Sequence, residues 1–203
     1  MPSSLAHLPQ LVVLFFVIFD PLASFAVYFT LTRDMEPRER RRVAALGLAV
    51  AAGLSVVVLL LGPGLLVLFS TTVDQFKVAG GIVLGLLGIK MALGGSLEGD
   101  DETKERSAQA VAAVIGTPLL TGPATITAII VSVQEDGLLP TALAVATVLL
   151  LTAALFASAP LVARFVNRTL VQVTSTLLGL ITLAWGVRFV VEGLLALAAS
   201  SKM

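Results

Sequence analysis

The chain has 203 residues, of which 57% are hydrophobic and only 13% are charged, and its mean hydropathy is +1.01. Soluble domains carry about 25% charged residues, so this composition excludes an ordinary soluble protein and points to the lipid bilayer as the solvent. The formal net charge is zero and no basic run is interleaved with aromatic residues, so no nucleic-acid partner is expected.

Six apolar stretches are long enough to cross the hydrocarbon core of a bilayer, for which a helix needs roughly 20 residues. Residues 1–10 carry no Lys or Arg and the apolar run 11–19 is interrupted by Asp20-Pro21, so we expect the first stretch to stay as a span and not to be removed as a signal peptide. The sequence therefore predicts an all-α membrane protein with six transmembrane helices, near residues 8–29, 43–69, 76–93, 108–133, 138–162 and 177–199.

The first span carries Asp20, the one carboxylate near the middle of any span, directly before Pro21. A charged side chain there costs at least about 2.5 kcal/mol on insertion scales and marks a functional site by default. Proline breaks the helix, which is tolerated at this depth only where protein or water satisfies the freed backbone groups. Asp followed by Pro is also an ordinary helix start, so a role as a helix cap alone stays open.

Basic residues gather in the loops on one side of the membrane. Because cytoplasmic loops hold the excess of Lys and Arg, these loops are predicted to be cytoplasmic, and an even number of spans places both termini outside. The opposite face has only Lys77 and Lys202, whereas the predicted cytoplasmic side has Arg33, Arg38, Arg40, Arg41, Arg42, Lys104, Arg106, Arg164 and Arg168.

An internal repeat relates the two halves of the chain. An offset of 98 residues superimposes 81–90 on 179–188, so that two glycines and a cation recur in step, and Gly95 falls on Gly193. Three helices are an odd number, so a second copy of the unit enters the membrane upside down, as in the inverted repeats of secondary transporters. We predict units 1–95 and 108–203, joined by an acidic cytoplasmic loop at 96–107. Chance similarity between apolar segments is the alternative.

The fourth span has an interruption that matches the one at Asp20. Pro118, Gly122 and Pro123 cannot lie in one continuous helix, and their flanks are too apolar for a surface loop. In inverted halves, the half-helices that begin at Pro21 and Pro123 start near the midplane and run to opposite faces. Their N-terminal amides can then hold one anionic group between them. Kinks that serve only packing are the alternative.

These groups together suit a zwitterionic solute: the half-helix N-termini can take a carboxylate, and Asp20 can take an ammonium. Asp20 is also the candidate for proton coupling, because no second midplane acid and no histidine within a span could share that work. The predicted substrate-binding residues are Asp20, Pro21, Ala23, Ser24, Thr121, Gly122, Pro123, Ala124, Thr125 and Thr127.

The remaining patterns predict helix packing, and none of them is typical of an enzyme. The spacing of Gly81, Gly85 and Gly88 is typical of closely packed membrane helices, and Arg188 with Glu192 fits an i,i+4 ion pair. The single histidine, His7, precedes the first span, there is no cysteine, and no second midplane Asp completes an aspartyl dyad. We expect no enzymatic activity, no cofactor and no metal.

The two proline motifs and the glycine-rich third span resemble the MarC family of bacterial inner-membrane proteins over essentially the whole chain. The matching residues are Phe19-Asp20-Pro21-Leu22, Gly80-Gly81-Ile82 through Met91, and Pro118 through Thr127. The resemblance implies six transmembrane helices, an inner-membrane location and, for some members, transport of small neutral amino acids. Where the family commonly has Gly-Asn and a second Pro, this chain has Ala23, Ser24 and Ala26, and it has Ala124 in place of a common Gly.

The expected function is therefore secondary transport of small zwitterionic solutes, with neutral amino acids as the substrate class. The alternatives are a membrane scaffold or assembly protein that transports nothing, and a passive pore for small solutes. The sequence leaves open whether the coupling ion is H⁺ or Na⁺ and whether the chain forms a homo-oligomer.

Overall fold

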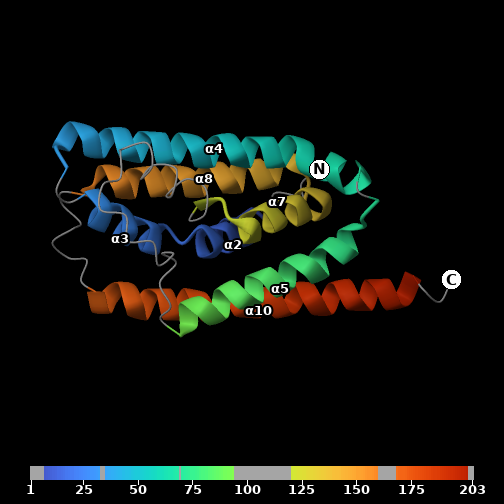
Figure 1. Ribbon diagram of the computed structural model, residues 1–203. Coiled ribbons are helices and arrows are strands. Elements are labelled where there is room, and N and C mark those ends of the chain that lie inside the picture. Colours follow the sequence, from blue (N-terminus) through green and yellow to red (C-terminus); the bar gives the residue numbers. More distant parts are fainter. Residues whose placement is uncertain (1–6, 33–34, 69, 94–119, 160–167, 201–203) are drawn as a thin grey trace.

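The computed structural model describes residues 7–32, 35–68, 70–93, 120–159 and 168–200 (Figure 1). Within these ranges all regular secondary structure is helical, as the sequence predicts. The helices are α2 (Leu8–Phe19), α3 (Pro21–Thr32), α4 (Pro37–Leu68), α5 (Val73–Ala92), α7 (Pro123–Glu135), α8 (Leu138–Ala157) and α10 (Arg168–Ser200).

Five of the predicted spans are long and apolar enough to cross a membrane: Leu8–Phe29, Pro37–Gly64, Val73–Ala92, Leu138–Ala157 and Gln172–Ser200. The predicted fourth span, 108–133, begins outside the described residues, and its described part is the 13-residue α7. The predicted loop 96–107 also lies outside them.

The start of α5 follows directly from local chemistry. The Thr72 hydroxyl accepts the Gln75 N–H at 3.2 Å, and the Gln75 side chain accepts the Thr72 N–H at 3.0 Å. This reciprocal capping box satisfies two amides that a helix start leaves without intrahelical partners. The helix therefore begins at Val73, three residues before the predicted start at Phe76.

The helices form three layers (Figure 1). In one outer layer α4 packs against α8, in the other α5 packs against α10, and the broken helices α2, α3 and α7 lie between them. The two helices of each outer layer run in opposite directions, and α7 runs opposite to α2 and α3. Many large apolar side chains on α4, α5, α8 and α10 are exposed, as expected for helix faces that meet lipid tails.

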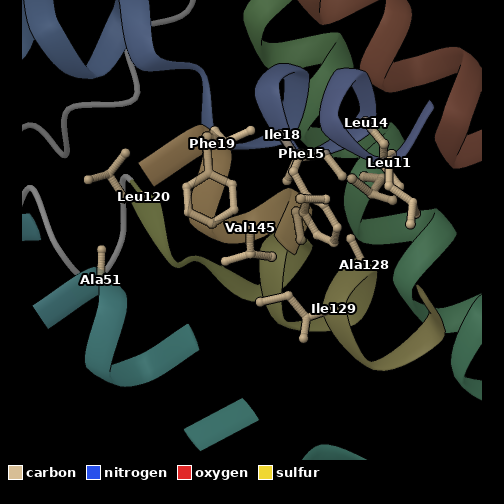
Figure 2. Close-up of a cluster of buried hydrophobic side chains, with 14 of the residues drawn as sticks. Leu11, Leu14, Phe15, Ile18, Phe19, Ala51, Leu120, Ala128, Ile129 and Val145 are labelled. Carbon is tan, nitrogen blue, oxygen red and sulfur yellow. The ribbon is translucent and has the colours of Figure 1, made fainter. Parts of the chain in front are cut away.

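The main core lies where the middle layer meets α4 and α8. Phe15 and Phe19 of α2 pack edge to face, with ring centroids 6.2 Å apart. Figure 2 shows them beside Ile129 of α7 and Val145 of α8 in a single cluster of buried side chains. Lipid tails are as apolar as such a core, so close packing and polar contacts hold these helices together, with little help from the hydrophobic effect.

Glycines let α5 and α10 approach until their backbones touch. A Cβ added at Gly81 would lie 2.6 Å from the Gly186 carbonyl oxygen, and one added at Gly88 would lie 2.6 Å from the Gly179 carbonyl oxygen. Each of these glycines therefore faces backbone and leaves no room for a side chain. The predicted packing role of Gly81 and Gly88 is confirmed.

Candidate functional site

The first helix break centres on Asp20. Its backbone is in the left-handed region, with φ 41°, an uncommon conformation for a residue other than glycine. Its N–H donates to the Phe16 carbonyl at 3.2 Å and closes α2, while its Oδ1 accepts the Ala23 N–H at 3.1 Å and caps α3. Asp20 therefore caps α3, as its place before Pro21 allows.

Capping uses only one of the two oxygens of this carboxylate. Asp20 is 3% exposed, and its Oδ2 has no hydrogen-bond partner. A buried polar atom without a partner costs about 1–3 kcal/mol, and more when the group is charged. The fold therefore retains an unpaired carboxylate oxygen at a helix break, which a helix cap does not require.

The second break lies at Gly122, which precedes α7 and offers no side chain to cap it. One hydrogen bond recurs at both breaks. The Ser24 hydroxyl donates to the Phe19 carbonyl at 3.3 Å, and the Thr125 hydroxyl donates to the Leu120 carbonyl at 3.1 Å. Each bond spans five residues across the break, so both interruptions are built in the same way.

The predicted site residues differ in what they offer a ligand. The Thr127 hydroxyl donates to the Pro123 carbonyl at 3.0 Å. The hydroxyls of Ser24 and Thr125 also donate to backbone carbonyls, so all three can only accept a hydrogen bond from a ligand. Ala23 and Gly122 are half-buried and Pro123 is exposed. The buried members of the set are Asp20, Pro21, Ser24, Thr121, Ala124, Thr125 and Thr127.

The two breaks lie in the middle layer of the molecule (Figure 1). From them α3 and α7 run to opposite ends of the helix bundle. Phe19 and Leu120, the residues at the two breaks whose carbonyls take the bridging hydroxyls, are both fully buried in the same core cluster (Figure 2). Pro21 and Pro123 predict both half-helices, and their opposite directions agree with the prediction (Figure 1).

An ion-pair cluster joins three helices at the end of α7. The ammonium of Lys77 on α5 pairs with Glu135 on α7 and, at 3.0 Å, with Glu192 on α10. Arg188 donates to Glu192 at 2.6 Å, as predicted, and lies 4.9 Å from the centre of the Trp185 ring. This cluster links the half-helix α7 to α5 and α10. The sequence predicts Lys77 only as a basic residue on the outer face and does not predict these two ion pairs.

The end of α3 is held in a different way. Arg40, at the start of α4, donates from Nε to the Thr32 carbonyl at 2.8 Å, and the Tyr28 hydroxyl donates to the Arg40 carbonyl at 3.2 Å. The Tyr28 ring stacks on Phe156 of α8, with centroids 4.6 Å apart. Each half-helix is therefore anchored at its far end by polar contacts, while its near end carries the break.

Replacing Lys77 with Met is expected to lower the free energy of unfolding by about 2 kcal/mol, because the 8%-exposed ammonium is the shared partner of two carboxylates. Arg188→Gln is the matched control. Its side chain is 58% exposed, and its loss should cost no more than about 1 kcal/mol. Denaturant unfolding in micelles measures both. Equal costs for the two variants would show that Lys77 does not tie the helices together.

Comparison with known proteins gives a match along nearly the whole chain: the sequence model of the MarC family integral membrane proteins covers residues 5–198. The chain belongs to the MarC family. Among its relatives, a UPF0056 membrane protein of Methanocaldococcus jannaschii is 30% identical, over 88% of this chain and 91% of its own. The UPF0056 membrane protein YhcE of Escherichia coli is 29% identical, over 88% and 87%.

A further relative, YhgN of Escherichia coli, is named as an inner membrane protein and is 28% identical over 55% of this chain. No solved structure matches this MarC protein. Family membership makes it an integral membrane protein, in agreement with its apolar helices. Among the described residues no group of three or more His, Asp and Glu side chains could hold a metal ion.

Proposed function

We propose that this MarC protein is a secondary transporter of small zwitterionic solutes, with neutral amino acids as its substrate class. The observation that carries the proposal is the unpaired Asp20 Oδ2, buried at a helix break. A substrate ammonium would give that oxygen its missing partner, and an N-terminus of a half-helix would receive the carboxylate. Asp20 is also the group we propose for coupling to H⁺, with Na⁺ as the other candidate ion.

The contacts between α5 and α10 support an inverted repeat. The offset of 98 residues maps Gly81 onto Gly179 and Gly88 onto Gly186. In the structure Gly81 meets Gly186 and Gly88 meets Gly179. Each contact therefore joins a glycine of one copy to the counterpart of the other glycine. Such reciprocal contacts are the mark of a two-fold relation. A two-fold axis in the membrane plane would make the two faces equivalent, as alternating access requires.

The proposed orientation places both termini outside an inner membrane. His7 before α2 contacts Asp136 after α7 at 3.2 Å, and Lys77 contacts Glu192 near the end of α10, so these segments share one end of the bundle. Arg40, Arg41 and Arg42 lie at the start of α4, which is at the opposite end of the bundle (Figure 1). The excess of basic residues there favours the cytoplasm for the start of α4 and the outside for the termini.

Uptake into proteoliposomes tests the function. Purified protein is reconstituted, an inward gradient of protons or of sodium is imposed, and internal labelled alanine is followed against vesicles without protein. The proposal predicts accumulation above the external concentration, abolished when an ionophore collapses the gradient. Equilibration without accumulation would indicate a passive pore. No movement of any neutral amino acid would favour a scaffold or assembly role.

A further inference from the structure

Ser55 in the middle of α4 stands apart from the other buried hydroxyls. Thr32, Thr152 and Thr182 each donate to the carbonyl four residues earlier in their own helices, at 2.7–2.9 Å, as such side chains do in helices. Ser55 is 1% exposed, yet its hydroxyl has no partner. With Asp20 Oδ2, it is one of two buried side-chain polar atoms without a partner among the described residues.

The helical register relates Ser55 to the start of α7. A Cβ added at Gly62 of α4 would meet Ile130 of α7 at 2.6 Å, so the two helices touch there. They run in the same direction (Figure 1). Two helical turns earlier on the same stripe of each helix are Ser55 and Pro123, because seven residues nearly complete two turns. The unpaired hydroxyl is thus level, within about one turn, with the second helix break.

The N-termini of the two half-helices differ in charge. At α3 the Asp20 carboxylate already accepts an amide and offsets the positive end of the helix dipole. At α7 the residue before the first turn is Gly122, which carries no charge and no capping side chain. The first amides of α7, among them those of Ala124 and Thr125, have no acceptor within the helix. The positive end of α7 is therefore the better place for an anion.

We propose that Ser55 and the N-terminus of α7 bind the carboxylate of the substrate, while Asp20 binds its ammonium. This assignment rests on the proposed transport of zwitterions and gives the substrate one orientation in the site. The hydroxyl of Ser55 donates to a carboxylate oxygen, and the amides of the first turn of α7 point to the same group.

The first test needs no knowledge of the substrate. The chain has no cysteine, so Ser55→Cys introduces a single thiol. It is made together with Asp20→Asn, which removes the carboxylate of the proposed site. We compare its reaction rates with an anionic methanethiosulfonate (sulfonatoethyl) and a cationic one (aminoethyl). Relative to a free thiol, the anionic reagent should be favoured about threefold to tenfold, because the proposed site places the positive end of α7 beside the thiol.

The control is Thr152→Cys in the same background. Thr152 is equally buried, but it lies on α8 and its hydroxyl is satisfied, so its thiol should react slowly and with no preference for charge. Preference for the cationic reagent at position 55, or reaction no faster than at position 152, would overturn the assignment.

The second test uses the ligand. Binding of alanine and of alaninamide, which lacks the carboxylate, is measured by titration calorimetry on wild type and Ser55→Ala. Loss of a hydrogen bond to a charged group should weaken alanine binding at least about tenfold and leave alaninamide nearly unchanged. Equal loss for both ligands would place Ser55 away from the carboxylate. If wild type binds no alanine, the proposed substrate class is wrong. The reaction rates of the thiol at position 55 still test whether an anion binds at the start of α7.

Discussion

Asp20→Asn is expected to yield a protein that folds like the wild type but loses gradient-driven uptake by about two orders of magnitude. Asn tolerates the left-handed backbone at position 20 and still accepts the Ala23 N–H, so stability should change by no more than about 1 kcal/mol. It cannot take up a proton and carries no charge for an ammonium. Losing one partner of a buried charge pair costs about 2–5 kcal/mol. Initial rates in proteoliposomes across pH 5–8 measure the effect.

Asp20→Ala separates the cap from the charge. Alanine cannot cap α3 and is strained in the left-handed conformation at position 20. Each effect costs about 1 kcal/mol, so this variant should be less stable by about 2 kcal/mol. If capping were the whole role of Asp20, the Asn variant would transport with the rate and the pH dependence of the wild type. That result would refute the proposed coupling role.

Gly88→Ala is expected to destabilise the protein by about 3 kcal/mol, near the upper end for overpacking a well-packed site. The new Cβ would lie 2.5 Å from the backbone nitrogen of Leu183 and 2.6 Å from the Gly179 carbonyl oxygen. Backbone atoms cannot turn aside as a flexible side chain can, so α5 and α10 must separate. Detergent-induced unfolding, followed by circular dichroism and by the fluorescence of Trp185 on α10, measures the loss.

Gly85→Ala is the matched control on the same helix. Its nearest neighbour would be the Leu183 Cδ1 atom at 3.8 Å, an ordinary contact, and alanine favours a helix over glycine by up to about 1 kcal/mol. This variant should therefore be as stable as the wild type or slightly more stable. Similar losses at positions 85 and 88 would mean that close backbone approach does not hold the pair.

The helix breaks could be predicted from the sequence because proline acts locally. Pro21 and Pro123 each remove a backbone donor whatever surrounds them, so the starts of α3 and α7 follow from the chain alone. The start of α5 was equally local: the spacing of Thr72 and Gln75 is a capping-box signal, although an apolar-stretch criterion places the start later.

Ser55 and Lys77 could not be predicted in the same way. A serine in an apolar helix normally bonds to its own backbone, and only the structure shows that the buried Ser55 hydroxyl does not. Lys77 follows a polar turn and reads as a solvated residue, whereas Glu135 and Glu192, its partners, are 58 and 115 residues away in the chain. Contacts between such distant segments are set by the tertiary fold.

The proposed transport requires one midplane site to be exposed to each side of the membrane in turn, and the accessibility of a single cysteine at Ala23 reports on this exposure. Ala23 is half-buried beside Asp20, and the native chain has no cysteine. An impermeant thiol reagent is applied to right-side-out and to inverted vesicles, with the ion gradient in either direction. We predict reaction from both sides, with one rate rising as the other falls when the gradient is reversed, and protection by alanine. Reaction from neither side, or rates that no gradient and no amino acid alters, would contradict alternating exposure of this site.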